Sequence, residues 1–232
     1  MFKPITPAIT IDIVSDVVCP WCYVGKKRLE KALTELPEGS EVKISWHPFQ
    51  LDPTIPDVGM ERNEYFLRKF GNGGKVEQMH AHLTNVGHEV GIDFRFDTIT
   101  YVLNTISLHK LLHVAGQEGF KDQAEEILFK AYFTDGKDLR EASVLAGLFE
   151  PFGWNQEKVE AILADDAIGY EVKQEITHYQ SMGVSGVPFF ILNNKYGVSG
   201  AQPSEVFVQA LTTVRDEMLE AMSGQACGPE GC

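Results

Sequence analysis

The chain passes from a predicted strand into a predicted helix at Ser15-Asp16-Val17-Val18-Cys19-Pro20-Trp21-Cys22. Before this stretch, Ile9, Ile11 and Ile13 alternate with other residues at a period of two, which is typical of a strand. After it, apolar residues recur at helical spacing until Pro37 ends the pattern. The two cysteines therefore lie where a helix begins.

A second strand is predicted shortly after that helix. Val42, Ile44 and Trp46 alternate with polar residues. Because a helix connects the two strands, they should lie parallel in one sheet. Residues 9–48 thus predict a βαβ unit.

The middle of the chain has a different pattern. From about Glu61 to Met182 the apolar residues fall at spacings of three and four, which predicts roughly six short helices. Several glycines stand where helix ends are expected, in keeping with C-terminal capping: Gly71, Gly91, Gly119 and Gly136. This block has no alternating strand pattern.

The chain returns to strands near its end. Residues 189–192 and 196–198 are apolar and flank Asn193-Asn194, which predicts an antiparallel hairpin, and a last helix should begin near Pro203 and Ser204. The order βαβ, helices, ββα predicts an α/β thioredoxin-like fold with a large all-helical insertion. We assign residues 1–60 and 183–222 to a discontinuous thioredoxin-like domain, 61–182 to the insertion and 223–232 to a tail.

Composition narrows the classes of partner. The 232 residues have a formal net charge of −13, so the field around the protein repels nucleic acid and anionic lipid. We find neither a secretory signal pattern nor an apolar run of the roughly 18 residues that span a membrane. The expected location is the cytoplasm, where cysteines are more often catalytic or metal-binding than structural.

Cys19 and Cys22 carry the strongest chemical signal. Two cysteines separated by two residues can close a disulfide, and a helix N-terminus stabilises a thiolate through its free N–H groups and its dipole. Cys19, at the edge of the helix, is the expected nucleophile, and Cys22, one turn further in, is the expected resolving thiol. One such pair cannot by itself hold zinc tetrahedrally, and we predict no metal site.

Further segments give the chain a family resemblance. They are the opening residues 15–22 with Gly25, then Trp46-His47-Pro48-Phe49 with Leu51 and Pro53, then Gly183-Val184-Ser185-Gly186-Val187-Pro188-Phe189-Phe190, and Ser199-Gly200-Ala201-Gln202-Pro203. Together they resemble the DsbA family of thioredoxin-fold oxidoreductases, most closely its cytosolic FrnE-like branch. The resemblance implies a cis Val187–Pro188 peptide facing Cys19, with the Val187 backbone pairing with an extended peptide or glutathione.

Trp21 departs from that family's periplasmic members, which typically carry histidine at this position. A tryptophan cannot place a cation beside the thiolate. We therefore expect a reduction potential lower than the value of about −120 mV given for DsbA. Pro20 and Trp21, with Val187 and Pro188, are expected to support the active site.

Cys227 and Cys232 end the chain around a Gly-Pro-Glu-Gly spacer that allows their sulfurs to meet. They are a candidate secondary redox pair that relays electrons to or from Cys19 and Cys22. An autonomous redox or metal-binding tail, and thiols without a role, remain open.

The histidines and a run of three basic residues are expected to have structural roles. The helical histidines are expected to be hydrogen-bonded or exposed rather than metal ligands: His80, His82, His109 and His113. Lys26, Lys27 and Arg28 are expected to form a solvated helix face, with steering of anionic substrates such as glutathione as the alternative.

The leading hypothesis is a protein disulfide oxidoreductase of the reductase or isomerase type. It needs no tightly bound cofactor, takes protein or small-molecule disulfides, and could use glutathione or a dithiol reductant as co-substrate; a homodimer is left open. The alternative is a glutathione-dependent isomerase or transferase resembling the 2-hydroxychromene-2-carboxylate isomerases and kappa-class transferases, which usually lack the first cysteine. A chaperone-like module with an apolar groove is the third reading.

Overall fold

The computed structural model describes residues 8–71 and 73–224. Its main sheet has the strand order β2-β1-β5-β6, with these bounds: β1 Ile9–Ser15, β2 Val42–Pro48, β5 Phe189–Leu192 and β6 Tyr196–Ser199. β1 and β2 are parallel, whereas β5 is antiparallel to both β1 and β6. The predicted βαβ unit, the hairpin and the α/β fold class are confirmed.

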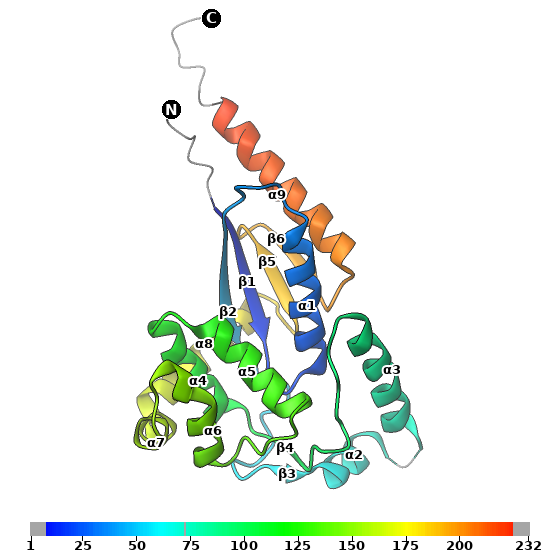
Figure 1. Ribbon diagram of the computed structural model, residues 1–232, viewed down its shortest axis with the longest axis vertical. Helices are drawn as coiled ribbons and strands as arrows, with labels where there is room; N and C mark the ends of the chain where they lie inside the picture. Colours follow the sequence, from blue (N-terminus) through cyan, green and yellow to red (C-terminus); the bar gives the residue numbers. More distant parts are fainter. Residues whose placement is uncertain (1–7, 72, 225–232) are drawn as a thin grey trace, which may run out of the picture.

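Two helices cover one face of this sheet (Figure 1). α1, Pro20–Thr34, and α9, Ser204–Gly224, lie side by side, and α9 also contacts β1 and β5. Ile9, Ile11 and Ile13 of β1 are almost fully buried, because β1 is a central strand of the sheet. The period-two pattern in the sequence therefore identified a strand at the centre of the core.

The segment between β2 and β5 is mainly helical. Its helices in the described residues are α2 Arg62–Phe70, α3 Lys75–Glu89, α4 Ile106–Gln117, α5 Lys121–Phe133, α6 Ala142–Phe149, α7 Gln156–Ala164 and α8 Asp166–Ser181, with a 3-10 turn at Glu150–Phe152. The expected number, roughly six, was slightly low. α7 and α8 are separated by Asp165 alone, whose carboxylate caps α8 by accepting from the N–H groups of Ala167 and Ile168.

A second, two-stranded sheet was not predicted. β3, Met60–Glu61, pairs antiparallel with β4, Tyr101–Val102. Two residues are too few to show alternation, so no sequence pattern could reveal these strands.

Trp46 and His47 connect β2 to the helical segment. The Trp46 indole N–H donates to Asp122 of α5 over 2.9 Å. The His47 ring lies between two carboxylates, with Nε2 2.9 Å from Asp12 Oδ1 and Nδ1 2.7 Å from Glu175 Oε1. Part of the motif that supported the family resemblance therefore anchors α5 and α8 to the edge of the sheet.

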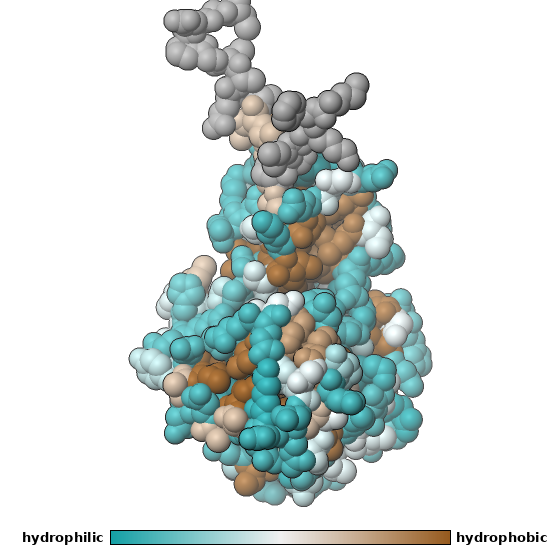
Figure 2. All heavy atoms as spheres, turned by 60° about the vertical axis from the view of Figure 1, so that its left-hand side comes forward, coloured by the Kyte–Doolittle hydropathy of each residue, from teal (hydrophilic) through white to brown (hydrophobic). Residues whose placement is uncertain are grey.

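Hydrophilic residues cover most of the face shown in Figure 2, and apolar residues gather there in separate areas of the sheet half and the helical half. No helix in the described residues is long and apolar enough to cross a membrane.

Candidate active site

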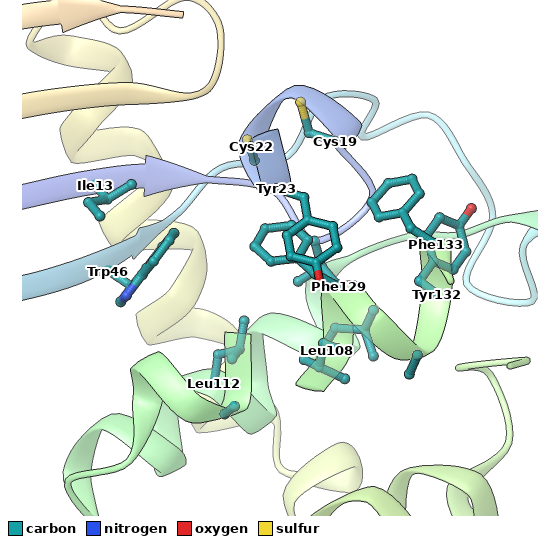
Figure 3. Packing of buried hydrophobic residues seen from close by; sticks show 14 of the residues in the cluster. Ile13, Cys19, Cys22, Tyr23, Trp46, Leu108, Leu112, Phe129, Tyr132 and Phe133 are labelled. Carbon is teal, nitrogen blue, oxygen red and sulfur yellow. The ribbon is translucent and has the colours of Figure 1, made fainter. Parts of the chain in front are cut away.

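Cys19 occupies the N-cap of α1, directly at the carboxyl end of β1. Its backbone is extended, with φ −93° and ψ 109°, and Pro20 is the first helical residue. The Cys19 N–H donates to the Asp16 carbonyl over 2.9 Å, and the Cys22 N–H donates to the Cys19 carbonyl over 3.0 Å. This tight turn places both sulfurs on the first turn of the helix, as Figure 3 shows.

The two thiols have unequal surroundings. Both are free, and Cys19 is 4% exposed against 1% for Cys22. Burial raises the pKa of Cys22 well above its ordinary value, and the hydrogen bond and charge of Cys19 raise it further; the Asp16 backbone and the Ser15 hydroxyl act in the opposite direction. Cys22 therefore stays protonated until a step that activates it.

A loop from the carboxyl-terminal half faces Cys19. The Val187–Pro188 peptide bond is cis, as the resemblance implied, and the Cys19 thiol lies 3.7 Å from the Val187 carbonyl oxygen, to which it donates. The loop is tied to the hairpin because the Gly200 N–H donates to the Pro188 carbonyl over 2.8 Å. Val187 is half-buried, and its N–H has no hydrogen-bond partner in the described part of the chain.

Gly25 allows α1 to approach this loop. A Cβ at Gly25 would lie 3.0 Å from Pro188 Cγ and 3.1 Å from Phe190 Cζ. A larger side chain at Gly25 would push α1 away from Pro188. This would change the distance between Cys19 and the Val187–Pro188 loop.

Trp21 faces the helical segment. Its ring centroid is 5.7 Å from that of His82 on α3, and His82 is exposed. The sequence motif has no histidine between its cysteines, yet the fold brings one beside Trp21. His82 is exposed, as expected, but its position beside Trp21 could not be predicted because the two residues are 61 positions apart in the sequence.

Buried polar groups surround the loop before Cys19. Asp16 Oδ2 accepts from the Leu51 N–H over 2.8 Å, and Oδ1 lies 3.5 Å from His109 Nε2. His109 Nε2 is also 2.8 Å from the Phe49 carbonyl, so this nitrogen carries the proton. Glu125 is 2% exposed, and burial raises its pKa to about 7. His109 is thus a hydrogen-bonded core histidine, as expected.

The solvated face expected for Lys26, Lys27 and Arg28 is wrong for Lys26. Its side chain is buried and forms ion pairs with Glu30, Asp122 and Glu126, the last at 3.2 Å. Burial disfavours its charge, but these carboxylates outweigh that effect and raise the pKa of Lys26. Asp122 and Glu126 belong to α5, so this lysine joins α1 to the helical segment rather than steering a substrate.

The described residues include no group of three or more His, Cys, Asp or Glu side chains placed to hold a metal ion. Cys227 and Cys232 lie outside the described residues.

A pocket opens beside the dithiol turn, between the thioredoxin-like part of the chain and the helical segment. The third hypothesis expected an apolar groove at this place, but no sequence pattern identified the residues that line it. Val18 and Pro20 form part of its wall, and the remainder comes from the loop after β2, from α2, α3 and α5, and from residues 96–105 around β4. Its charged lining residues are Asp16, Asp52, Arg62 and Lys69. Arg62 and His80 appear in the sequence as ordinary residues of amphipathic helices, so no pattern marked them.

A dithiol at the first turn of a helix, set against a cis-proline loop on a β2-β1-β5-β6 sheet, defines a protein of the thioredoxin-fold class. The model of the DSBA-like thioredoxin domain matches residues 10–212, and the chain belongs to this family. A probable DsbA oxidoreductase from Streptomyces coelicolor is 34% identical with a TM-score of 0.80, over 97% of this chain and 98% of that one.

Two more distant structures share the fold. The cytosolic disulfide reductase DsbM from Pseudomonas aeruginosa, solved with GSH, is 18% identical with a TM-score of 0.61, covering 89% of this chain and 99% of that one. A 2-hydroxychromene-2-carboxylate isomerase is 19% identical with a TM-score of 0.63, covering 94% and 96%. The family includes DsbA-like oxidoreductases, and the same architecture also occurs in an isomerase.

Proposed function

We propose that this protein is a thiol-disulfide oxidoreductase of the reductase or isomerase type, from the FrnE-like branch of the family, acting in the cytoplasm. The observation that carries the proposal is the pairing of Cys19 with the cis Val187–Pro188 loop while Cys22 lies deeper and holds its proton. The cytosolic location named for DsbM agrees with the expected compartment.

The proposed reaction has two exchanges. The Cys19 thiolate attacks one sulfur of a substrate disulfide, which forms a mixed disulfide and releases the other sulfur as a thiolate that takes up a proton. Cys22 then gives up its proton and attacks the Cys19 sulfur, which releases the second substrate thiol and leaves a Cys19–Cys22 disulfide. The substrate gains two electrons and the enzyme loses two.

The oxidised enzyme must then be reduced. Two molecules of glutathione, or one dithiol, would return two electrons to Cys19 and Cys22 and leave as a disulfide. The structure of DsbM with GSH supports glutathione as a candidate co-substrate. Cys227 and Cys232 remain a proposed relay for the same electrons.

Substrate recognition would use the loop at Val187. Its unpaired N–H and its carbonyl can pair with the backbone of an extended peptide or of glutathione. Pro20 and Trp21 would flank the bound disulfide, and Pro188 would hold the loop against Cys19.

The first experiment measures the equilibrium reduction potential of Cys19 and Cys22 in glutathione buffers, together with reduction of insulin disulfides. The protein carries Cys227→Ser and Cys232→Ser, so that only one pair titrates. We expect a potential near −200 mV or below, and reductase activity that Cys19→Ser lowers to the uncatalysed rate. A dithiol with no redox equilibrium would overturn the proposal, and a potential close to −120 mV would overturn its reductase direction.

The second candidate is the glutathione-dependent isomerase or transferase. The shared architecture of 2-hydroxychromene-2-carboxylate isomerase is the observation in its favour, and the intact pair of cysteines is the observation against it. Cys22→Ser separates the two functions. It should stop dithiol turnover, whereas glutathione-dependent isomerisation that survives in this variant would favour the second candidate.

A further inference from the structure

The pocket beside the dithiol has mainly apolar walls. Its cavity volume is about 190 Å³, which limits it to a small ligand. Aromatic side chains contribute much of the lining: Tyr65, Phe66, Phe70, Phe96, Tyr132 and Phe133. Such walls favour a ligand with a flat apolar body.

Arg62 brings a positive charge into this apolar surface. It begins α2, is half-buried, and its guanidinium carbon lies 4.7 Å from the Phe66 ring centroid and 5.9 Å from that of Phe96. Burial lowers the pKa of Arg62, which reflects the cost of holding its charge away from water. The charge nevertheless remains, because guanidinium groups do not lose their proton in proteins.

The hydrogen-bond partner of Arg62 does not neutralise it. Arg62 Nη2 lies 2.8 Å from His80 Nε2, and burial together with Arg62 itself lowers the pKa of His80 to about 4. At neutral pH His80 is therefore uncharged and accepts this bond. Within residues 8–71 and 73–224, no carboxylate forms an ion pair with Arg62, although exposed Glu61 contributes a favourable charge from further away.

Two of the other charged lining groups, Asp52 and Lys69, lie close to each other. Asp52 accepts from the Thr54 and Tyr65 hydroxyls and lies 3.8 Å from Lys69. Lys69 donates to the Tyr65 hydroxyl. Of the two cationic lining groups, Lys69 therefore has a carboxylate beside it, whereas Arg62 forms no ion pair with the described residues.

The side of the pocket nearer the dithiol carries hydrogen-bond acceptors instead of a positive charge. Asp16 and Thr105 also line the pocket, and each is 1% exposed. Among the described residues, Asp16 Oδ1 and Thr105 Oγ1 have no hydrogen-bond partner, although Asp16 Oδ1 lies 3.5 Å from His109 Nε2. These oxygens can accept from a ligand, but the Asp16 carboxylate repels an anion. An anionic ligand is therefore oriented, with its charged group at Arg62.

We propose that this pocket binds an apolar carboxylic acid, with its carboxylate on Arg62 and its apolar body between the aromatic walls and the turn of Val18 and Pro20. A single guanidinium in a low-dielectric wall fits one negative charge and can bind a carboxylate through two N–H groups. The site goes beyond the proposed disulfide chemistry and does not need it, because neither Cys19 nor Cys22 lines the pocket.

The test is calorimetric titration of the reduced full-length protein with 2-naphthoate and with the uncharged 2-naphthamide. We expect 2-naphthoate to bind at least about tenfold more tightly, because a hydrogen bond to a charged group contributes about 1.5–3 kcal/mol. Arg62→Gln should remove this preference, and Arg62→Lys should keep part of it. Arg68→Gln, on the same helix but exposed and paired with Glu64, is the matched control and should keep all of it.

Equal binding of acid and amide to the wild type would overturn the proposal, and so would a preference that survives Arg62→Gln. Displacement of 2-naphthoate by an uncharged apolar peptide, with no effect of Arg62→Gln, would assign the pocket to polypeptide side chains instead. The double variant Cys19→Ser, Cys22→Ser should bind 2-naphthoate like the wild type. A failed redox function and a failed binding site are therefore distinguishable.

Discussion

The two sides of the dithiol are built in different ways. On the sheet side, the cis Val187–Pro188 loop meets Cys19 through backbone atoms and close packing at Gly25. On the helical side, side chains with charges and hydrogen bonds provide the contacts, including Lys26 with its three carboxylates. Backbone contacts can accept many disulfide substrates, whereas side chains can select among them, so the helical segment is where we expect selectivity to reside.

Lys26→Met tests how much the ion pairs on the helical side stabilise the protein. Removing this buried cation takes an ion-pair partner from Glu30, Asp122 and Glu126, of which Glu30 and Glu126 keep Lys27. Because these carboxylates are partly exposed, we expect a cost of about 1–3 kcal/mol. Urea unfolding should show a loss of stability of that order. Lys130→Met on the same α5 as Glu126 is the control, since the exposed pair with Asp135 contributes at most about 1 kcal/mol. Similar losses of stability in both variants would show that the ion pairs of buried Lys26 contribute no more than the exposed pair of Lys130.

Glu125 makes the helical side sensitive to pH. Its pKa in the folded protein is about 7, above its ordinary value, so the native state binds a proton that the unfolded state has released. Stability should therefore fall as pH rises from about 4.5 to 7, by about 3 kcal/mol from this group. Glu125→Gln should abolish that part of the decline in urea unfolding at pH 5 and pH 8.

The control for this prediction is Glu64→Gln, because Glu64 is exposed on α2. It should retain the wild-type difference between the two pH values. A Glu125→Gln protein with the full wild-type decline would show that the buried carboxyl does not take up the proton.

Gly25→Ala tests the close packing on the sheet side, where the expected effect is smaller. The new methyl group would press on Pro188 and on the fully buried Phe190, so we expect a net loss of about 1 kcal/mol despite the better helix propensity of alanine. Gly147→Ala in α6 meets nothing within 4 Å and should gain up to about 1 kcal/mol. Thermal unfolding should thus move in opposite directions; a gain in both variants would show that the loop yields easily.

Much of the fold could be predicted because its patterns are local. The alternation at Ile9, Ile11 and Ile13 gave a strand, and the two asparagines at φ 49° and 53° form the turn expected between β5 and β6. The β3–β4 pair was missed because two-residue strands show no period. The sequence predicted roughly six helices in the middle block, whereas the described residues there form seven, of which α7 and α8 are separated by one capping residue.

The sequence by itself determined the dithiol at a helix start, the βαβ and ββα units, and, through the resemblance, the cis-proline loop. All of these are read from residues that are close along the chain. Tertiary structure alone decided that Lys26 is buried against α5, that His82 lies beside Trp21, and that Arg62 lines an apolar pocket where no carboxylate of the described residues forms an ion pair with it. The physical reason is that burial and charge pairing depend on how α1, α2, α3 and α5 pack, and this packing joins residues too far apart along the chain for any local period to record.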